Sequence, residues 1–263
     1  MNIVVIPNIK LPGSKRSDSY QYSIESWKHW CKKQNVELFI LDELVYPIEE
    51  MKITWQRWMI FEILEANGYK LIDKIDQVAL VDADTVIHPD CPFFFGRMTN
   101  WDFTGVVNDG DYEWVLRSIK NYTDEFFPGM DYISPSEYIN NGMIILTAKH
   151  RTFCDEVIKF YWDNKDQIIE SYDKFKVSTD QTIVNILRKQ HEIKTTILPT
   201  TFNLQDLFRK NLLYVDERCW WEDTLENMYK AGYIYHFNAI PGNTLKRDAN
   251  YWIKRTYEEL YKK

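Results

Sequence analysis

A short apolar run that ends in two carboxylates constrains this chain more than any other stretch. The run extends from Val78 to Val81, and Asp82 and Asp84 follow directly, with one residue between them. Uninterrupted apolar runs of this length are typical of strands that are buried on both faces of a parallel sheet. Ligands of open α/β sheets bind just beyond the carboxyl ends of such strands. The stretch therefore predicts an α/β sheet with a site at Asp82 and Asp84.

The two aspartates predict a site for a divalent cation. Alternate residues of an extended chain point the same way, so both carboxylates should converge on one point. They would repel each other unless a positive charge lay between them, and hard divalent cations prefer oxygen ligands. The alternative is an Asx turn or a helix cap, because Asp is common at the end of a strand.

Length and charge limit the classes of protein to which the chain can belong. Its 263 residues suffice for one large α/β domain or two small ones, and no repeat or Pro/Gly-rich linker divides them. A net charge of −7 argues against a nucleic-acid-binding protein, which would carry a basic surface. The cysteines show no paired spacing, and no apolar run resembles a signal peptide or a membrane span. We therefore expect one domain in a cytoplasmic protein.

The rest of the pattern alternates between strands and helices, which predicts right-handed parallel crossovers. Apolar runs predict strands at 3–6, 36–41, 103–107, 142–146, 196–198 and 233–235. Helical spacing predicts helices at 20–31, 53–65 and 152–167, from residue 178 onward, and at 251–261. The polar segment 108–137 is expected to be an irregular insertion near the site.

Four separated motifs carry a resemblance to a known family. They are LVDADTVI (80–87), YINNGMIIL (138–146), STDQTIVNIL (178–187) and YHFNAIPGNTLK (235–246), and LPTTFNLQ (198–205) accompanies them. In these motifs the chain resembles nucleotide-sugar-dependent glycosyltransferases of GT-A fold, most closely family 8 and its retaining relatives. A lone Asp-x-Asp motif arises by chance in any long sequence, whereas four motifs in the family's order are a strong signal.

The resemblance implies a single GT-A domain over 1–263, with a Rossmann-like, mostly parallel central sheet flanked by helices. Residues 1–107 would form the nucleotide-binding half, 108–250 the sugar and acceptor half, and 251–263 a helical tail. The implied reaction moves a sugar from a nucleotide donor, expected to be UDP-linked, to a glycan or another hydroxyl-bearing acceptor, with retention of the anomeric configuration.

The resemblance also implies which residues hold a metal. Asp82, Asp84 and His236 would bind Mn²⁺ or Mg²⁺, with Ala83 of the same motif beside the donor. A mixed set of carboxylates and one imidazole suits either ion, and the cation would stabilise negative charge on the departing diphosphate as a Lewis acid. A satisfied structural histidine at the end of a strand is the alternative for His236.

The sugar-binding residues come from two motifs. By resemblance, Asn141 and Gly142 lie against the donor sugar, Asp180 binds its hydroxyls, and Gln181 lies on the face of the anomeric carbon opposite the leaving group. Two alternatives remain open. In one, Asn141 and Gly142 form only a tight turn; in the other, Gln181 closes a helix capping box with Ser178.

Six further residues are carried over from the family. Arg57 is expected near the phosphates or the sugar, Pro7 and Asn8 near the nucleobase, and Asn203 on the acceptor side. Gly242 and Lys246 lie in a loop that would contact the diphosphate. The spacing from His236 to Gly242 is longer than in the family and no Pro follows Lys246, so a surface lysine remains the alternative there.

Several other functions fit parts of the sequence. A haloacid-dehalogenase-type phosphatase would use Asp82 as its nucleophile, and an inverting GT-A enzyme would need a base such as Asp109, Asp111 or Asp131. A non-catalytic sugar-binding module is a further option. A pyrophosphorylase is disfavoured because its Gly-rich loop is missing. The basic, aromatic tail from residue 245 either contacts a membrane surface peripherally or packs onto its own domain.

Overall fold

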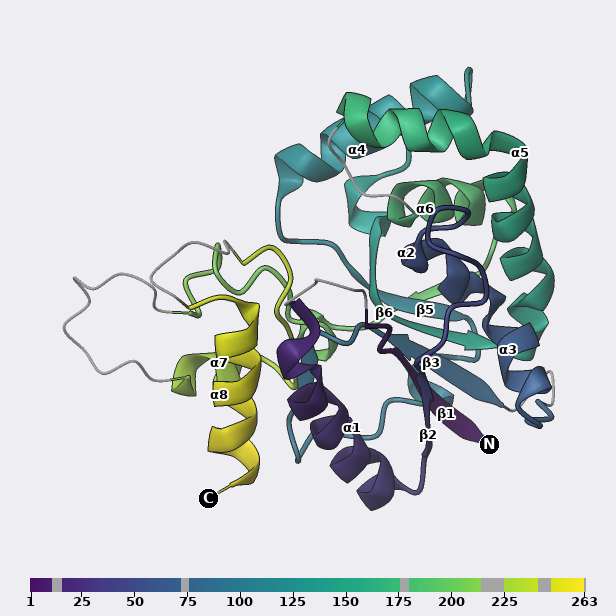
Figure 1. The fold of residues 1–263 in the computed structure, drawn as a ribbon. Helices are drawn as coiled ribbons and strands as arrows, with labels where there is room; N and C mark the ends of the chain where they lie inside the picture. Colours follow the sequence, from purple (N-terminus) through teal and green to yellow (C-terminus); the bar gives the residue numbers. More distant parts are fainter. Residues whose placement is uncertain (11–15, 72–75, 176–179, 214–224, 241–246, 263) are drawn as a thin grey trace.

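The computed structural model describes residues 1–10, 16–71, 76–175, 180–213, 225–240 and 247–262 (Figure 1). The strands are β1 (Asn2–Pro7), β2 (Glu37–Leu41), β3 (Gln77–Val81), β4 (Thr85–Ile87), β5 (Phe103–Val107), β6 (Ile139–Thr147), β7 (Thr195–Ile197) and β8 (Ile234–His236). The helices are α1 (Tyr20–Gln34), α2 (Ile53–Gln56), α3 (Ile60–Ala66), α4 (Tyr112–Phe126), α5 (Arg151–Phe175), α6 (Gln181–Gln190), α7 (Glu226–Ala231) and α8 (Ala249–Tyr261).

A six-stranded sheet forms the centre of the molecule, in the order β2-β1-β3-β6-β5-β7. Strand β6 runs antiparallel to its neighbours β3 and β5, whereas the other described pairs of this sheet are parallel. The expected mostly parallel sheet flanked by helices is therefore confirmed.

Both faces of the central strands are covered, as the apolar runs predict. In β1, Ile3 and Val5 belong to one buried cluster, and Val4 and Ile6 belong to another. The same alternation holds in β3 and β6. Because successive side chains of a strand point to opposite faces, each face needs its own layer of helices. The polar ends of these strands are then the part of the sheet left for a site.

Two layers of helices enclose the sheet (Figure 1). Helices α2 to α6 pack on one face, where Trp55, Ile119 and Ile183 join the first buried cluster. Helix α1 covers the other face with Trp27 and Trp30 and packs against α8. The tail thus packs on its own domain, as one of the two sequence alternatives predicted. No helix in the described part of the chain is long and apolar enough to cross a membrane.

Two expectations about helices were wrong. The predicted helix at 53–65 is broken into α2, a 3₁₀ turn at Arg57–Met59 and α3. The segment 108–137 is not irregular, because it contains α4. The Asp111 side chain caps α4 by accepting from the Trp114 N–H at 3.1 Å. Apolar residues recur along its buried face, but the many polar residues between them obscured this period.

A separate two-stranded sheet brings the last motif to the first. Strands β4 and β8 pair antiparallel, and Thr85 lies opposite His236. The Phe237 N–H donates to the Asp84 carbonyl oxygen at 2.9 Å. Below this sheet, Val86 and Tyr235 pack with Trp252 of α8. The pairing fixes the position of His236 beside the two aspartates.

Candidate metal and ligand site

Asp82, Asp84 and His236 converge on one point. The His236 Nε2 atom lies 3.3 Å from Asp84 Oδ1 and 3.6 Å from Asp82 Oδ2. One ligand atom from each residue lies within 4.8 Å of the other two. Asp84 and His236 are buried, and Asp82 is half-buried. Two carboxylates and one imidazole at this spacing could hold a divalent cation of the Mn²⁺ or Mg²⁺ class.

The environment of Asp82 is suited to a positive charge. Burial raises the pKa of its carboxyl above the ordinary value, while the charges of Arg57 and His236 act to lower it. A cation bound nearby would favour the ionised form of the Asp82 carboxyl and so lower its pKa.

The two aspartates lie in a turn and not in an extended strand, contrary to the alternation that the sequence suggested. Strand β3 ends at Val81, and Asp82 to Asp84 form the bend before β4. The Thr85 hydroxyl donates to the Asp82 carbonyl oxygen at 2.8 Å, and the Trp27 indole N–H donates to that hydroxyl at 2.9 Å. The turn is therefore anchored to α1, and the carboxylates converge through it.

Arg57 is buried and joins two carboxylates. Its Nη1 lies 2.7 Å from Asp82 Oδ1, and its Nη2 lies 3.0 Å from Asp180 Oδ2. Burial disfavours the charged guanidinium, but the two carboxylates outweigh burial and raise the pKa of Arg57. The 3₁₀ turn that interrupts the predicted helix places Arg57 here, buried and not on the surface of a helix.

Asp180 receives three hydrogen bonds on one oxygen. Arg57 Nη2, Trp58 Nε1 and Asn141 Nδ2 all lie within 3.1 Å of Asp180 Oδ2. The side chain therefore does not cap α6, although Asp180 immediately precedes that helix. The Asn141 Oδ1 atom is buried with no hydrogen-bond partner among the described residues. A polar ligand such as a sugar hydroxyl would satisfy this oxygen.

Gln181 binds the neighbouring strand. Its Oε1 accepts from the Asn141 backbone N–H at 3.0 Å. The capping-box alternative also needs Ser178, which lies outside the described residues. Gln181 Oε1 is in any case already engaged by β6.

Gly142, Asn140 and Asn203 surround the inner edge of His236. A Cβ on Gly142 would lie 2.2 Å from His236 Cε1, so only glycine fits. Asn203 is fully buried, with its Oδ1 3.2 Å from His236 Nδ1. The role on the acceptor side that the resemblance implies for Asn203 stays a prediction. Residues 140 to 142 lie in strand β6, so the alternative of a tight turn at Asn141 and Gly142 is wrong. The sequence analysis names Asn141 and not Asn140, and the Asn-x-Gly spacing from Asn140 to Gly142 is the signal that could have found it.

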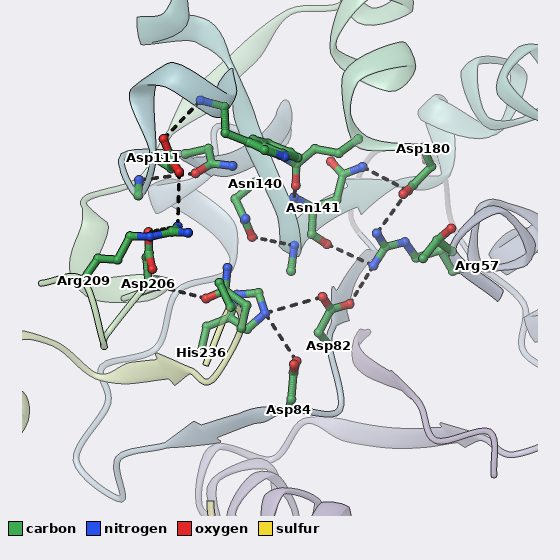
Figure 2. A pocket seen from close by; sticks show the side chains of 18 residues that line it. Arg57, Asp82, Asp84, Asp111, Asn140, Asn141, Asp180, Asp206, Arg209 and His236 are labelled. Atoms are coloured by element: carbon green, nitrogen blue, oxygen red, sulfur yellow. Dashed lines mark hydrogen bonds and ion pairs between the residues drawn. The ribbon is translucent and has the colours of Figure 1, made fainter. Parts of the chain in front are cut away.

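Asp82, Asp84 and His236 line a hollow that has two opposite sides (Figure 2). Arg57 and Asp180 lie on one side, with Asp82, Asp84 and His236 at the centre. Asp111, Asp206 and Arg209 lie on the other. The Arg209 guanidinium is 3.0 Å from Asp206 Oδ2 and 3.4 Å from Asp111 Oδ2.

Asp206 was missed by sequence reasoning although it directly follows the LPTTFNLQ motif. It is buried, its φ is +54°, and its Oδ1 has no hydrogen-bond partner among the described residues. A Cβ on Gly110 would lie 2.8 Å from Asp206 Oδ2. Positive φ is uncommon outside glycine, and such strain clusters at functional sites. The available signals in the sequence were the acidic residue directly after the motif and the arginine three positions later, Arg209.

A second hollow adjoins the first at Asp82, Asp84 and Arg57. Its other walls are mainly apolar and aromatic, with Pro7, Ile9, Tyr20 and Ile53, and Ala83 also faces it. Asn8 does not line this hollow; it borders a smaller one with Lys10 and Gln21. Pro7 therefore lines the same hollow as Asp82 and Asp84, and Asn8 borders a separate one.

The remaining predicted residues are dispersed. Gly242 and Lys246 lie outside the described residues. Asp109 pairs with Lys210 at 2.8 Å, and Asp131 is exposed away from the hollow.

No protein-family model and no curated protein sequence matches the chain. Solved structures, in contrast, superpose on the chain. A glycosyltransferase involved in the glycosylation of the major capsid of PBCV-1 superposes with a TM-score of 0.58 at 10% identity, over 96% of this chain and 98% of the other. The chain has the GT-A fold. The apo-form glycosyltransferase GlyE of Streptococcus pneumoniae TIGR4 gives a TM-score of 0.50 at 12% identity.

The GlyE superposition covers 99% of this chain but 63% of GlyE, so the chain spans less than two thirds of that protein. At such identities the likeness concerns the GT-A fold and not the substrates. The fold expected from the four motifs is confirmed. In this fold the candidate metal ligands lie beyond the carboxyl end of β3, where the first motif predicted a site.

Proposed function

We propose that the protein is a metal-dependent glycosyltransferase, similar to family 8, that moves a sugar from a UDP-linked donor to a hydroxyl-bearing acceptor with retention. The convergence of Asp82, Asp84 and His236 where the two hollows meet carries the proposal. A hollow on either side of one candidate cation site suits a ligand with a diphosphate between two unlike ends. A phosphatase would need only one such space.

The chemistry of the two hollows supports one orientation of the proposed donor. The apolar and aromatic walls at Pro7, Ile9 and Tyr20 suit a nucleobase and ribose. The polar side at Asn141 and Asp180 suits sugar hydroxyls. This arrangement agrees with an N-terminal nucleotide-binding half over 1–107 and a sugar-binding half over 108–250.

Two side chains of the protein and one bound cation would prepare the donor for transfer. Arg57 holds the Asp82 and Asp180 carboxylates in one orientation. The unpartnered Asn141 Oδ1 would accept from a sugar hydroxyl and so orient the ring. A divalent cation bound by Asp82, Asp84 and His236 would supply Lewis-acid stabilisation of the charge that develops on the diphosphate.

The acceptor would enter over the opposite side of the hollow. The buried Asp206 Oδ1 is an unpartnered acceptor, and the half-exposed Arg209 offers donors. Neighbouring donors and acceptors of this kind suit a polyhydroxyl acceptor such as a glycan.

The positions of the candidate bases favour retention. Asp109 is paired with Lys210, and Asp111 both caps α4 and pairs with Arg209. Asp131 is exposed away from the hollow. An inverting reaction needs a carboxylate that is available to take a proton from the acceptor. These three are engaged or remote, and Asp206, which also lines the hollow, pairs with Arg209 through Oδ2.

A panel of nucleotide sugars tests the proposal. We expect Mn²⁺-dependent binding of UDP by calorimetry, and slow hydrolysis or transfer of one UDP-sugar. Asp84→Ala should abolish both, whereas the exposed control Asp90→Asn should leave both unchanged. NMR of the product's anomeric proton reports retention. Magnesium-dependent turnover of a phosphate ester that is lost in Asp82→Asn, without UDP binding, would overturn the proposal.

A further inference from the structure

We propose that Asn140 and Asn203 are positioning residues that fix the tautomer of His236, so that Nδ1 carries the hydrogen and Nε2 is the ligand nitrogen. This inference rests on the proposed metal-dependent function, but its central claim concerns a hydrogen position that can be measured without metal. It follows from four groups in a row, beginning at a backbone N–H that can only donate.

The first step fixes the Asn140 amide. The Gly142 backbone N–H lies 2.8 Å from the Asn140 side-chain oxygen. A backbone N–H has no lone pair, so it must face an acceptor. The Asn140 side chain therefore turns Oδ1, and not its NH₂ group, toward Gly142.

The second step fixes the Asn203 amide. The same Asn140 Oδ1 lies 3.0 Å from Asn203 Nδ2. Because Asn140 presents an oxygen, Asn203 must present its NH₂ group. The other end of the Asn203 amide, its Oδ1, then faces His236 Nδ1 at 3.2 Å.

The third step fixes the imidazole. The Asn203 oxygen can only accept, so His236 Nδ1 must carry a hydrogen and donate it. The opposite nitrogen, Nε2, points to Asp84 and Asp82 at 3.3 and 3.6 Å. When the ring is neutral, Nε2 has the lone pair and lies where a cation would be bound. Asn203 thus plays the part of the oxygen partners that commonly orient metal-binding histidines.

The packing leaves these groups little freedom to rearrange. Asn140, Asn203 and His236 are buried, with Asn203 fully inaccessible. A Cβ at Gly142 would lie 2.6 Å from His236 Nδ1 and 2.8 Å from Asn140 Oδ1. The hydrogen-bonded row also joins β6 to β8, which belong to different sheets. Reversing one amide would break at least two hydrogen bonds in a buried region.

NMR of ¹⁵N-histidine-labelled, metal-free protein tests the inference directly. Two-bond ¹H–¹⁵N correlations distinguish the two neutral tautomers when recorded above the pH at which the ring titrates. The chain contains five histidines, and comparison with His236→Asn assigns the relevant signal. We expect the Nδ1–H form for His236. The Nε2–H form in the unmodified protein would overturn the inference without any variant.

Three variants separate positioning from general packing. Asn203→Leu removes the acceptor, and Asn140→Leu lets the Asn203 amide turn over; both should yield a tautomer mixture and a roughly 10- to 100-fold loss of Mn²⁺ affinity by calorimetry. Asn140→Asp keeps an acceptor for Gly142 and Asn203, so it should retain the Nδ1–H form. Unchanged tautomer and unchanged Mn²⁺ affinity in folded Asn203→Leu would refute the positioning role. Mn²⁺ binding with the expected tautomer but no sugar transfer would instead refute only the proposed function.

Discussion

Arg57 and Asp180 form a buried ion pair, 3.0 Å from Nη2 to Oδ2, although 123 residues separate them in the chain. The pair joins the 3₁₀ turn before α3 to the start of α6. The same guanidinium reaches Asp82, so the candidate metal site and the candidate sugar site share one cation of the protein. A change at Arg57 should therefore affect both.

Replacing Arg57 tests this sharing. Arg57→Ala removes the guanidinium that contacts the buried Asp180 and Asp82 carboxylates, which should lower the free energy of unfolding by about 3–5 kcal/mol. Arg57→Lys keeps a positive charge but cannot contact Asp82 and Asp180 through two separate nitrogens. Donor turnover should therefore fall by a larger factor than the folding equilibrium constant. Urea unfolding and donor turnover measure the two effects. Arg151→Ala, at the exposed pair with Glu65, is the matched control and should change little.

Gly142→Ala should weaken cation binding by displacing His236. The added Cβ would lie 2.2 Å from His236 Cε1, a distance that no side chain tolerates. We expect at least a roughly ten-fold loss of Mn²⁺ affinity, by analogy with the disruption of groups that orient ligands. Gly68→Ala is the control: its φ of +85° makes it costly by about 1–2 kcal/mol. That variant should lose stability yet bind Mn²⁺ normally.

Asp206→Asn should distinguish acceptor binding from donor binding. The substitution keeps the shape of the side chain but removes the charge that faces Arg209 and the hollow. Loss of a charged hydrogen bond costs about 1.5–3 kcal/mol, so KM for the acceptor should rise roughly 10- to 100-fold. KM for the UDP-sugar should change by less than about two-fold, because Asp206 lies on the side of the hollow opposite Arg57 and Asp180. Equal effects on both substrates would contradict the assignment of this side to the acceptor.

Stability should fall in mild acid because of His150. Burial lowers the pKa of this imidazole to about 4, and its Nδ1 accepts from the Thr147 backbone N–H at 3.0 Å. The unfolded chain, with a histidine pKa of about 6.5, takes up the proton first. The contribution is therefore present above about pH 6.5 and is lost as the pH falls toward about 4, by about 2 kcal/mol between pH 7 and 5.

The matched variant for this prediction is His150→Asn, whose amide oxygen can still accept from Thr147 but does not titrate. Urea unfolding at both pH values should show a smaller acid loss in the variant than in the unmodified protein. Identical pH dependence in the two would show that His150 is not responsible.

The strands that consist of short, uninterrupted apolar runs could be predicted from the sequence. The runs at Ile3 and Val78 are buried on both faces because they contain no polar residue, and polarity changes abruptly at Asp82. The strand pairing of β4 with β8 could not be predicted, because short strands far apart in the chain carry no register signal. The resemblance supplied His236 where spacing alone would not have.

The missed residues depend on tertiary contacts. The sequence predicts an irregular segment where α4 forms, because polar residues separate the buried positions of this helix. Asp206 and Arg209 have ordinary surroundings in sequence, and only folding places them beside Asp111. The burial of Asn203 behind His236 follows from the pairing of β8.

The pairing of Thr85 with His236 also has a consequence for synthesis of the protein. Both carboxylates leave the ribosome early, but the imidazole follows about 150 residues later, at the elongation rate of roughly 5–20 residues per second. A nascent chain from which β8 has not yet emerged would contain Asp82 and Asp84, which repel each other, but not His236 as the third candidate ligand. Cation capture would then have to wait until β8 has emerged, and manganese retention by translation intermediates stalled before and after β8 would time that event.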